Sequence, residues 1–271
     1  MKKLLSLSDA FLIPLCLLFL YPFYYLVVST LKTQSEMAFN PVGLPMKPDL
    51  ANYAAQLGNG HLGQAFLNTT FLTVCSVLLI VVIGEMAAYP IVYRPGKLNT
   101  GFLFYIMVGF LVPFQAILLT LFDIMKNLHF INQLYGMVAF YSNGATLTVF
   151  LTVGYMRSIP KELVEAARID GCSIPRTFFS ILFPLLKPIS VTSVIFNTMW
   201  IWNDFIAPNI FLNSRSKGTL VLELYRAKGQ FNVDWPMFMT LSVMIIFPIF
   251  LFYVFMQKYI IKGLTAGAVK G

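Results

Sequence analysis

Charged residues are scarce in this chain. Only 11% of its 271 residues are Asp, Glu, Lys or Arg, whereas 58% are hydrophobic and 26 are Phe. A soluble domain of this size carries about a quarter charged residues, because its surface has to be wetted by water. The shortage of charge excludes an ordinary soluble domain and favours an integral membrane protein.

Residues that bind metals or form disulfides are also few, with three Cys and two His. Cys16 and Cys75 fall inside hydrophobic runs and Cys172 in a segment that we expect in the cytoplasm, so no extracellular disulfide is expected. His61 and His129 stand alone, without the Cys–His spacing of a metal site. The sequence therefore predicts no metal centre in this chain.

A nucleotide-binding motif is lacking as well. The stretch GNGHLG at 58–63 matches GxGxxG by letter, but it follows no expected strand and lies in an outer segment. A GxxxxGK(S/T) sequence does not occur. We therefore expect no cofactor in this chain and no ATPase activity of its own.

What the chain does have is long hydrophobic runs, each long enough to cross a hydrocarbon core of about 30 Å as a helix. The first follows MKK but is too long for a signal peptide and shows no small-residue cleavage site, so we expect it to be retained. The sequence thus predicts an all-α polytopic membrane protein with six transmembrane helices in one domain, 1–271. The expected spans cover about 10–31, 66–90, 98–122, 134–157, 186–212 and 235–257.

The distribution of basic residues indicates the orientation. With a cytoplasmic N-terminus, twelve Lys and Arg fall in inner segments and seven in outer ones. This bias obeys the positive-inside rule and places both termini in the cytoplasm, in a bacterial cytoplasmic membrane. The net charge of +8 is then a topology signal, so no nucleic-acid partner is needed beside the membrane lipid.

The longest inner segment, 158–184, contains helix signals rather than loop signals. Ser158 is a candidate N-cap, Pro160 is tolerated in a first turn, and Gly171 is the expected stop. A second start at Ser173 and Pro175 would open a further helix that turns its apolar residues back to the membrane. The apolar residues are Phe178, Phe179 and Leu182, and the breaks before the fifth span are Pro184 and Pro188.

The first of these helices has a face built from small and acidic residues. Leu163, Ala166, Ala167 and Asp170 share this face, and Glu165 is spaced to pair with Lys161 and Arg168. A helix lying on anionic lipid would instead carry Lys or Arg along one face and large apolar residues on the other. We therefore favour protein docking over lipid docking.

The stretch EAARIDGCSIPRTFFSILFP resembles the EAA loop of permease subunits in binding-protein-dependent ABC importers. The matching residues are Glu165, Ala166, Ala167, Gly171, Ile181 and Pro184, while Cys172 and Phe183 depart mildly. The resemblance implies the type I importer permease fold with a cytoplasmic coupling helix. In that helix, seated in a groove of the ATPase subunit, the coupling residues would be Glu165, Ala166, Ala167, Asp170 and Gly171.

Other stretches look like carbohydrate-importer permeases, the second permease of the maltose or multiple-sugar type in particular. They are AAYPIVYRPGK at 87–97, PFQAILLTLFDIMKNLHFIN at 113–132, WNDFIAP at 202–208 and GLTAGAVKG at 263–271. The likeness implies a transport subunit rather than an enzyme, which moves a carbohydrate by alternating access. Its implied partners are a homologous permease in a heterodimer, two ATPase subunits that bind the ATP and Mg, and an extracellular solute-binding protein.

The resemblance also assigns two contact regions. The C-terminal tail, 258–271, would reach the ATPase interface through Gly263, Leu264, Thr265, Gly267 and Lys270, the alternative being a frayed end. The outer segment 213–235 would touch the binding protein, with a helix lying on the membrane face as the alternative. Its candidate contact residues are Arg215, Lys217, Arg226 and Lys228.

Polar residues inside the fifth span are candidates for a sugar path. They are Asn197, Trp200, Asn203 and Asp204. A charge at membrane depth is costly, so Asp204 should face the bundle interior or water, and an interhelical hydrogen bond is the alternative to sugar contact. Glu85, at the inner end of the second span, is expected to pair with Arg94 or a neighbouring subunit.

The sequence disfavours two other classes of membrane protein. An ion-coupled secondary transporter would show internal repeats and intramembrane ion ligands, and neither is clear here. A membrane-embedded glycan or lipid transferase would need clustered His, Asp or Glu at a membrane face, and this chain has two isolated His and one acidic residue within a span.

Overall fold

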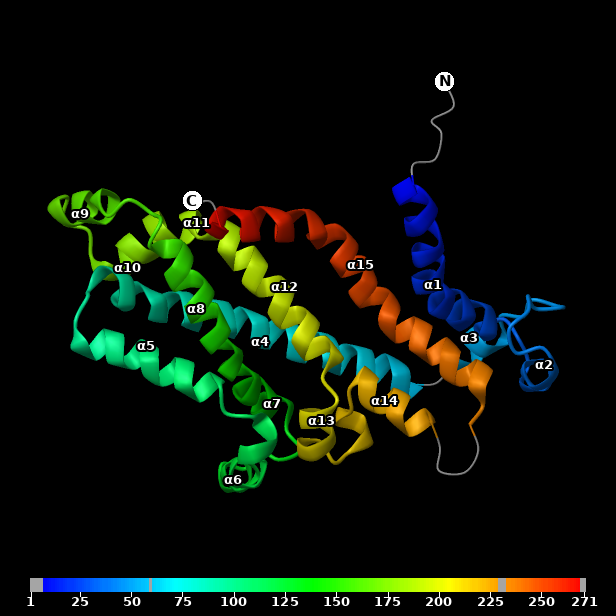
Figure 1. The fold of residues 1–271 in the computed structure, drawn as a ribbon. Coiled ribbons are helices and arrows are strands. Elements are labelled where there is room, and N and C mark those ends of the chain that lie inside the picture. Colours follow the sequence, from blue (N-terminus) through cyan, green and yellow to red (C-terminus); the bar gives the residue numbers. More distant parts are fainter. Residues whose placement is uncertain (1–6, 59, 229–232, 269–271) are drawn as a thin grey trace. The chain divides into compact units, whose positions relative to one another are not determined.

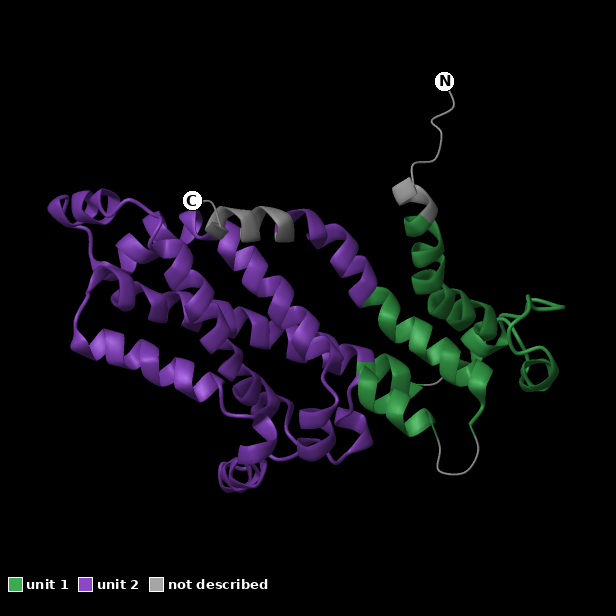
Figure 2. Cartoon of the chain, in the orientation of Figure 1, with its two compact units in different colours: residues 1–65, 220–248 green, residues 66–219, 249–271 purple. Residues whose placement is uncertain are grey.

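The computed structural model describes the backbone of residues 7–58, 60–228 and 233–268, and every regular element in these ranges is helical (Figure 1). The all-α prediction is confirmed for the described chain. Its residues form two compact units, Met1–Ala65 with Leu220–Pro248 and Phe66–Thr219 with Ile249–Gly271 (Figure 2). Each unit is described by itself.

The first unit joins a membrane-type helix to a hydrogen-bonded segment that follows it. Helix α1 spans Leu7–Thr30 and is followed by α2, Gln34–Phe39, and α3, Ala51–Leu57. The fully buried ammonium of Lys32 donates to the carbonyls of Asn40 and Pro41 at 2.7 and 3.2 Å. Asn52 donates to the carbonyls of Thr30 and Lys32, so the segment folds back on the end of α1. Helix α14, Leu220–Ala227, and the first part of α15, Trp235–Ala268, complete the unit.

The second unit contains the remaining helices. Helix α4 covers Gly60–Tyr93, α5 Lys97–Phe110, α6 Phe114–Asn127, α7 Leu134–Tyr141, and the 3₁₀ turn η1 Ser142–Gly144 leads into α8, Ala145–Met156. Then follow α9 at Glu162–Ile169, α10 at Ile174–Thr177, the π-helix η2 at Phe178–Leu182, α11 at Phe183–Leu185 and α12 at Lys187–Asn203. Helix α13, Ile206–Phe211, and the 3₁₀ turn η3, Arg215–Lys217, follow at the end of the unit away from α9, which we call its outer end (Figure 1). Helix α9 lies at the end of the unit where α8 stops and α12 starts, away from α6 and α13 (Figure 1).

The number of membrane spans depends on how bent helices are counted. Four described helices are long and apolar enough to cross a bilayer: Phe11–Thr30, Gly60–Tyr93, Leu134–Met156 and Trp235–Tyr259. Two further pairs pass only together, Lys97–Phe110 with Phe114–Asn127, bent by 102°, and Ile174–Leu185 with Lys187–Asn203, bent by 77°. The described chain therefore has four spans, or up to six if each bent pair is one span.

Prolines and helix stops account for the two places where an expected span is interrupted. The expected helix over 98–122 ends at Phe110 and starts again at Phe114, with Pro113 as the first residue outside the new helix. Proline has no N–H to donate and its ring clashes with the preceding turn, which favours a break at Pro113. Proline alone does not force a break, because α1, α4 and α15 each continue through interior prolines. The helix expected over 186–212 ends at Asn203, where Asp204 leaves the helical conformation, and α13 follows as a separate element.

The buried core of the second unit lies beneath α9. Val149, Val153 and Met156 of α8 pack there with Ala88 and Val92 of α4. The same cluster takes in Val164 from α9, Phe178 and Leu182 from η2, and Leu186 and Ile189 at the start of α12. The segment 158–184 is therefore packed onto the ends of the membrane helices and is not a free loop.

Candidate functional site

Helix α9 starts later than its end signals predict. The helix begins at Glu162, preceded by Lys161, which makes no side-chain cap. Ser158 does not cap the helix, because its hydroxyl donates to the carbonyl of Tyr155 in the preceding turn at 2.7 Å. The expected cap is thus wrong: the hydroxyl closes the end of α8 instead.

The stop of α9 is the one expected from sequence. Gly171 has a φ of +75°, in the left-handed region that glycine favours. Its N–H donates to the carbonyl of Arg168 at 3.1 Å, and the N–H of Cys172 donates to the carbonyl of Ala167 at 2.9 Å. This pair of bonds is the Schellman arrangement, which satisfies carbonyls left over at a helix end. A β-carbon at Gly171 would meet open space, so the requirement for glycine is conformational and not steric.

The two central alanines of α9 face different ways. Ala167 is buried with Val164 against the chain's own core, whereas Ala166 and Glu165 are exposed. Asp170 is exposed just past the helix end. The predicted docking residues therefore fall into two groups. Ala167 packs the helix against the core, whereas Glu165, Ala166 and Asp170 are exposed.

Sequence reasoning placed Leu163 and Ala166 on the docking face of α9 but missed Ile169, which completes an exposed apolar patch there. Ile169 is 86% exposed and Leu163 is 43% exposed, on either side of Ala166. The buried face of the helix consists of Val164 and Ala167. The available signal for a contact surface was Ile169, an apolar residue that does not lie on this buried face. Among the described residues Glu165 forms no ion pair with Lys161 or Arg168, so its carboxylate stays exposed beside the patch.

The second half of the loop turns back to the core largely as expected. Ser173 precedes α10 in an extended conformation and Pro175 lies in its first turn. Phe178 and Leu182 are buried, whereas Phe179 is 48% exposed, so two of the three expected apolar residues face inward. The chain then bends by 77° between Leu185 and Lys187, close to Pro184 and Pro188.

The candidate path residues of α12 fall into two groups. Asn197 is buried in an interhelical network: its side-chain amide donates to the hydroxyls of Ser193 at 3.2 Å and Thr148 at 3.4 Å. Asp204 accepts hydrogen bonds from the hydroxyl of Tyr141 at 2.9 Å and from the N–H of Ile206. Asn197 thus bonds α12 to α8, and Asp204 bonds the end of α12 to α7. Both contacts are of the interhelical kind that was the alternative to sugar contact.

Trp200 and Asn203 are the exposed members of the set. Trp200 is 42% exposed and meets the ring of Tyr141 edge to face, with centroids 5.5 Å apart. The amide of Asn203 donates to the carbonyl of Met199 within its own helix. An indole face can contact the apolar face of a sugar, and an amide can bond its hydroxyls. Trp200 and Asn203 lie at the surface of the unit and not in its interior.

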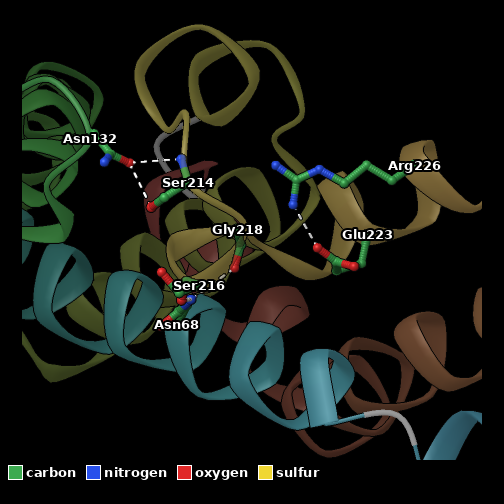
Figure 3. A network of polar contacts seen from close by, with 7 residues as sticks. All are labelled: Asn68, Asn132, Ser214, Ser216, Gly218, Glu223 and Arg226. Carbon is green, nitrogen blue, oxygen red and sulfur yellow. Dashed lines mark hydrogen bonds and ion pairs between the residues drawn. The ribbon is translucent and has the colours of Figure 1, made fainter.

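Asn132 fixes the outer end of the second unit (Figure 3). It has a φ of +58°, and its side-chain oxygen accepts from the N–H groups of Asn213 and Ser214 and from the hydroxyl of Ser214, at 2.9–3.2 Å. The side-chain amide of Asn68 donates to the carbonyls of Ser216 and Gly218, each at 2.9 Å. We call this set of hydrogen bonds the outer bracket.

The basic residues proposed for binding-protein contact are not equivalent. The ammonium of Lys217 donates to the carbonyl of Asn132 at 2.6 Å and to Gln133 at 2.9 Å, so it belongs to the outer bracket. In the first unit, Arg226 pairs with Glu223 at 2.6 Å along α14 (Figure 3). Arg215 and Lys228 are exposed.

The C-terminal segment is helical as far as it is described. Helix α15 continues through Gly263, Leu264, Thr265 and Gly267 to Ala268, and Lys270 lies outside the described residues. The described part of the tail is thus a continuation of the last span.

Glu85 does not pair with Arg94, one of its two expected partners, among the described residues. Its carboxylate is fully buried in α4, and neither oxygen has a hydrogen-bond partner among the described residues. Ser190 lies close to this carboxylate. The described residues also contain no cluster of three or more His, Cys, Asp and Glu side chains that would hold a metal ion.

Comparison with known proteins connects this geometry to a family. A family model described as "Binding-protein-dependent transport system inner membrane component" matches residues 80–265. The chain is 35% identical to the probable starch degradation products transport system permease protein AmyC of Thermoanaerobacterium thermosulfurigenes, covering 95% of this chain and 94% of that protein. It is 36% identical to the multiple sugar-binding transport system permease protein MsmG of Streptococcus mutans, covering 94% and 93%.

A solved structure supports the fold. The crystal structure of a bacterial ABC transporter involved in the import of the acidic polysaccharide alginate contains a chain that matches with a TM-score of 0.83 and 21% identity. The match covers 95% of this chain and 99% of that one. The importer permease fold is confirmed, and family membership implies an ATPase and a solute-binding protein as partners. The segment 158–184 is packed against the ends of the membrane-type helices. This chain belongs to the inner-membrane components of binding-protein-dependent transport systems.

Proposed function

We propose that the chain is a permease subunit of an ATP-driven carbohydrate importer of a bacterial cytoplasmic membrane, with both termini in the cytoplasm. Its named relatives support a sugar as the cargo: besides AmyC and MsmG, the melibiose/raffinose/stachyose import permease protein MelC of Bacillus subtilis is 34% identical over 92% of this chain. The family assignment disfavours the ion-coupled transporter and the glycan or lipid transferase. ATP and Mg belong to the partner ATPase.

The single observation that carries the coupling role is the outward patch of α9. Leu163, Ala166 and Ile169 place exposed apolar surface on a short helix outside the membrane-type helices. Exposed apolar patches rimmed by charge mark protein contacts, and Glu165 and Arg168 supply that rim. Because α9 is packed on the inner ends of α8 and α12, an ATPase that moves it also moves those helices.

The complete assembly contains a homologous permease, two ATPase subunits and an extracellular binding protein. The tail 258–271 supplies a second ATPase contact, and its described backbone continues α15 as far as Ala268. Arg215 and Lys228 are exposed basic residues that would meet the binding protein. Lys217 and Arg226 also form bonds within this chain.

Replacing Ile169 with Asp tests the coupling contact. The side chain is 86% exposed, so the change should leave the fold intact while it places a charge in the docking groove. We expect at least about a tenfold loss of ATP-driven sugar uptake in proteoliposomes, together with loss of the co-purified ATPase. The matched control is Leu98→Asp, an 89% exposed residue at the start of α5 on the same side. Equal ATPase recovery and uptake in both variants would show that α9 is not the docking element.

A further inference from the structure

A groove in the second unit opens between α5, α8 and α12 and is not used by any role described above. Its volume is about 540 Å³. Its apolar walls come from Leu103 and Met107 of α5, Phe150 and Val153 of α8, and Ile189 of α12. Sites for small molecules are typically concave, largely apolar and roughly 300–1,000 Å³ in volume.

Gly154 leaves the middle of the groove open. A β-carbon at this position would have no atom within 4 Å, and the residue is exposed. The neighbouring side chains Phe150 and Met107 are also exposed, at 54% and 41%. At Gly154 the surface of the groove is therefore formed by the backbone of α8, and the exposed side chains of Phe150 and Met107 lie nearby.

A few polar groups are present at the groove. They are Tyr155, Arg157 and Thr192. Arg157 is exposed and has neither a hydrogen-bond nor an ionic partner for its side chain among the described residues. Thr192 is 1% exposed and its hydroxyl donates to the carbonyl of Pro188, so Arg157 is the charged group that a ligand in the groove can reach. A small number of placed polar groups in an apolar groove is the usual pattern by which a site fixes the orientation of a ligand.

This mixture fits a carbohydrate better than the residues expected from sequence. A sugar ring has an apolar C–H face, suited to the rings of Phe150 and Tyr155, and hydroxyl groups, suited to the guanidinium of Arg157. Asn197 and Asp204 are already occupied within the helix bundle. We propose that the groove at Gly154, and not the buried polar residues of α12, is the surface of this chain that contacts the carbohydrate on its way through the membrane.

The position of the groove links it to the coupling helix. Gly154 lies two residues before the end of α8 at Met156, and Arg157 begins the turn that leads to α9. Val153 of the groove wall and Val164 of α9 belong to the same buried cluster. A displacement of α9 therefore changes the shape of this groove. The inference rests on the proposed sugar-import function.

The first test fills the groove. Gly154→Leu should lower uptake at least about tenfold for the longest sugar that the wild type carries from a series of melibiose, raffinose and stachyose, and less for the shortest. The matched control is Gly109→Leu, an exposed glycine of α5 whose β-carbon also meets open space but which lies outside the groove. Co-purification of the partner permease and the ATPase should be unchanged in both variants.

The second test uses protection from a thiol reagent. With Cys16, Cys75 and Cys172 replaced by Ser, Gly154→Cys should react with a small hydrophilic methanethiosulfonate, and the transported sugar should slow the reaction at least about threefold. A sugar that is not transported should have no effect, and neither sugar should protect Gly109→Cys.

The possible results separate the inference from the function on which it rests. If the wild type carries no sugar of a di- to tetrasaccharide panel, the proposed function fails and the inference falls with it. If sugar is carried but Gly154→Leu and Gly109→Leu transport equally well, the inference alone is overturned. Loss of the partner permease from the Gly154→Leu assembly would assign the groove to a protein helix. Reagent access that changes with lipid composition but not with sugar would assign it to an acyl chain.

Discussion

The two ends of the second unit stabilise their connecting segments in different ways. At the outer end, the outer bracket uses side-chain amides, a hydroxyl and an ammonium to tie together segments far apart in the sequence. At the other end, α9 is held by burial of Val164 and Ala167 and by the backbone bonds at Gly171. The polar groups of the outer bracket are thus used within the chain, whereas α9 leaves its charges and an apolar patch exposed.

This difference shows that charge in a sequence does not by itself indicate a partner. Lys217 is basic and lies in a connecting segment, yet its ammonium donates to the carbonyl of Asn132 and to the side chain of Gln133. Glu165 lies in the other connecting segment and has no partner among the described residues. An exposed charge becomes informative only once the internal hydrogen bonds are known.

The largest effect on stability is expected from Asn132→Ala. The change removes an acceptor of three hydrogen bonds and a residue type that tolerates the left-handed φ of this position. The two bonds from Ser214 are half-buried and the bond from Asn213 is exposed. A buried donor left unpaired costs about 1–3 kcal/mol, and Ala at this φ costs about 1–2 kcal/mol. We therefore expect a loss of about 3 kcal/mol, read as a lower thermal unfolding midpoint in detergent. The control Asn143→Ala removes only a local bond to the carbonyl of Phe140. Similar midpoints for the two variants would mean that the outer bracket contributes little.

A pair of adjacent substitutions distinguishes the two faces of α9. Ala167→Trp overpacks the core and should cost about 2 kcal/mol of stability, because extra volume forces neighbouring side chains from their preferred positions. Ala166→Trp should leave the unfolding midpoint unchanged but lower the amount of ATPase that co-purifies. The reverse pattern would show that the helix is rotated in the working assembly.

A smaller effect is expected at the stop of α9. Gly171→Ala places a β-carbon at a φ of +75°, which costs about 1–2 kcal/mol. The cost should appear as lower thermal stability and weaker ATPase recovery, and Gly171→Asn should restore part of both, because Asn tolerates this conformation. As the control, Gly109→Ala within α5 should be neutral or slightly stabilising, since Ala favours a helix over Gly. A destabilisation at position 109 equal to that at 171 would contradict the conformational explanation.

The smallest effect is expected from Arg226→Gln in the first unit. Its ion pair with Glu223 has a 31% exposed arginine side chain, and pairs of this kind contribute at most about 1 kcal/mol. The unfolding midpoint should hardly move. A drop in uptake without a change in the midpoint would make Arg226 a contact for the binding protein, and unchanged uptake would support the assignment of that contact to Arg215 and Lys228.

Much of the architecture follows from local signals in the sequence. The hydrophobic runs account for α1, α4, the α7–α8 stretch and α15, because a chain with so few charges has to bury those runs away from water. Gly171 and the prolines near 184–188 mark a helix stop and a bend, since both depend on the backbone properties of single residues. Pro113 was a signal in the sequence for the break between α5 and α6. The run 98–122 is so apolar, however, that hydropathy alone predicted one helix.

The sequence by itself determined the membrane class, the α9 segment and the stop at Gly171, because composition and backbone preference act over a few residues. The tertiary structure decided that Ala167 faces inward while Ile169 faces outward, and that Lys217 and Asn197 are bonded within the chain. It also created the groove at Gly154 from three helices that are distant in sequence. Which side of a helix is buried, and which polar groups find partners, depends on neighbours that are brought together only when the helices pack.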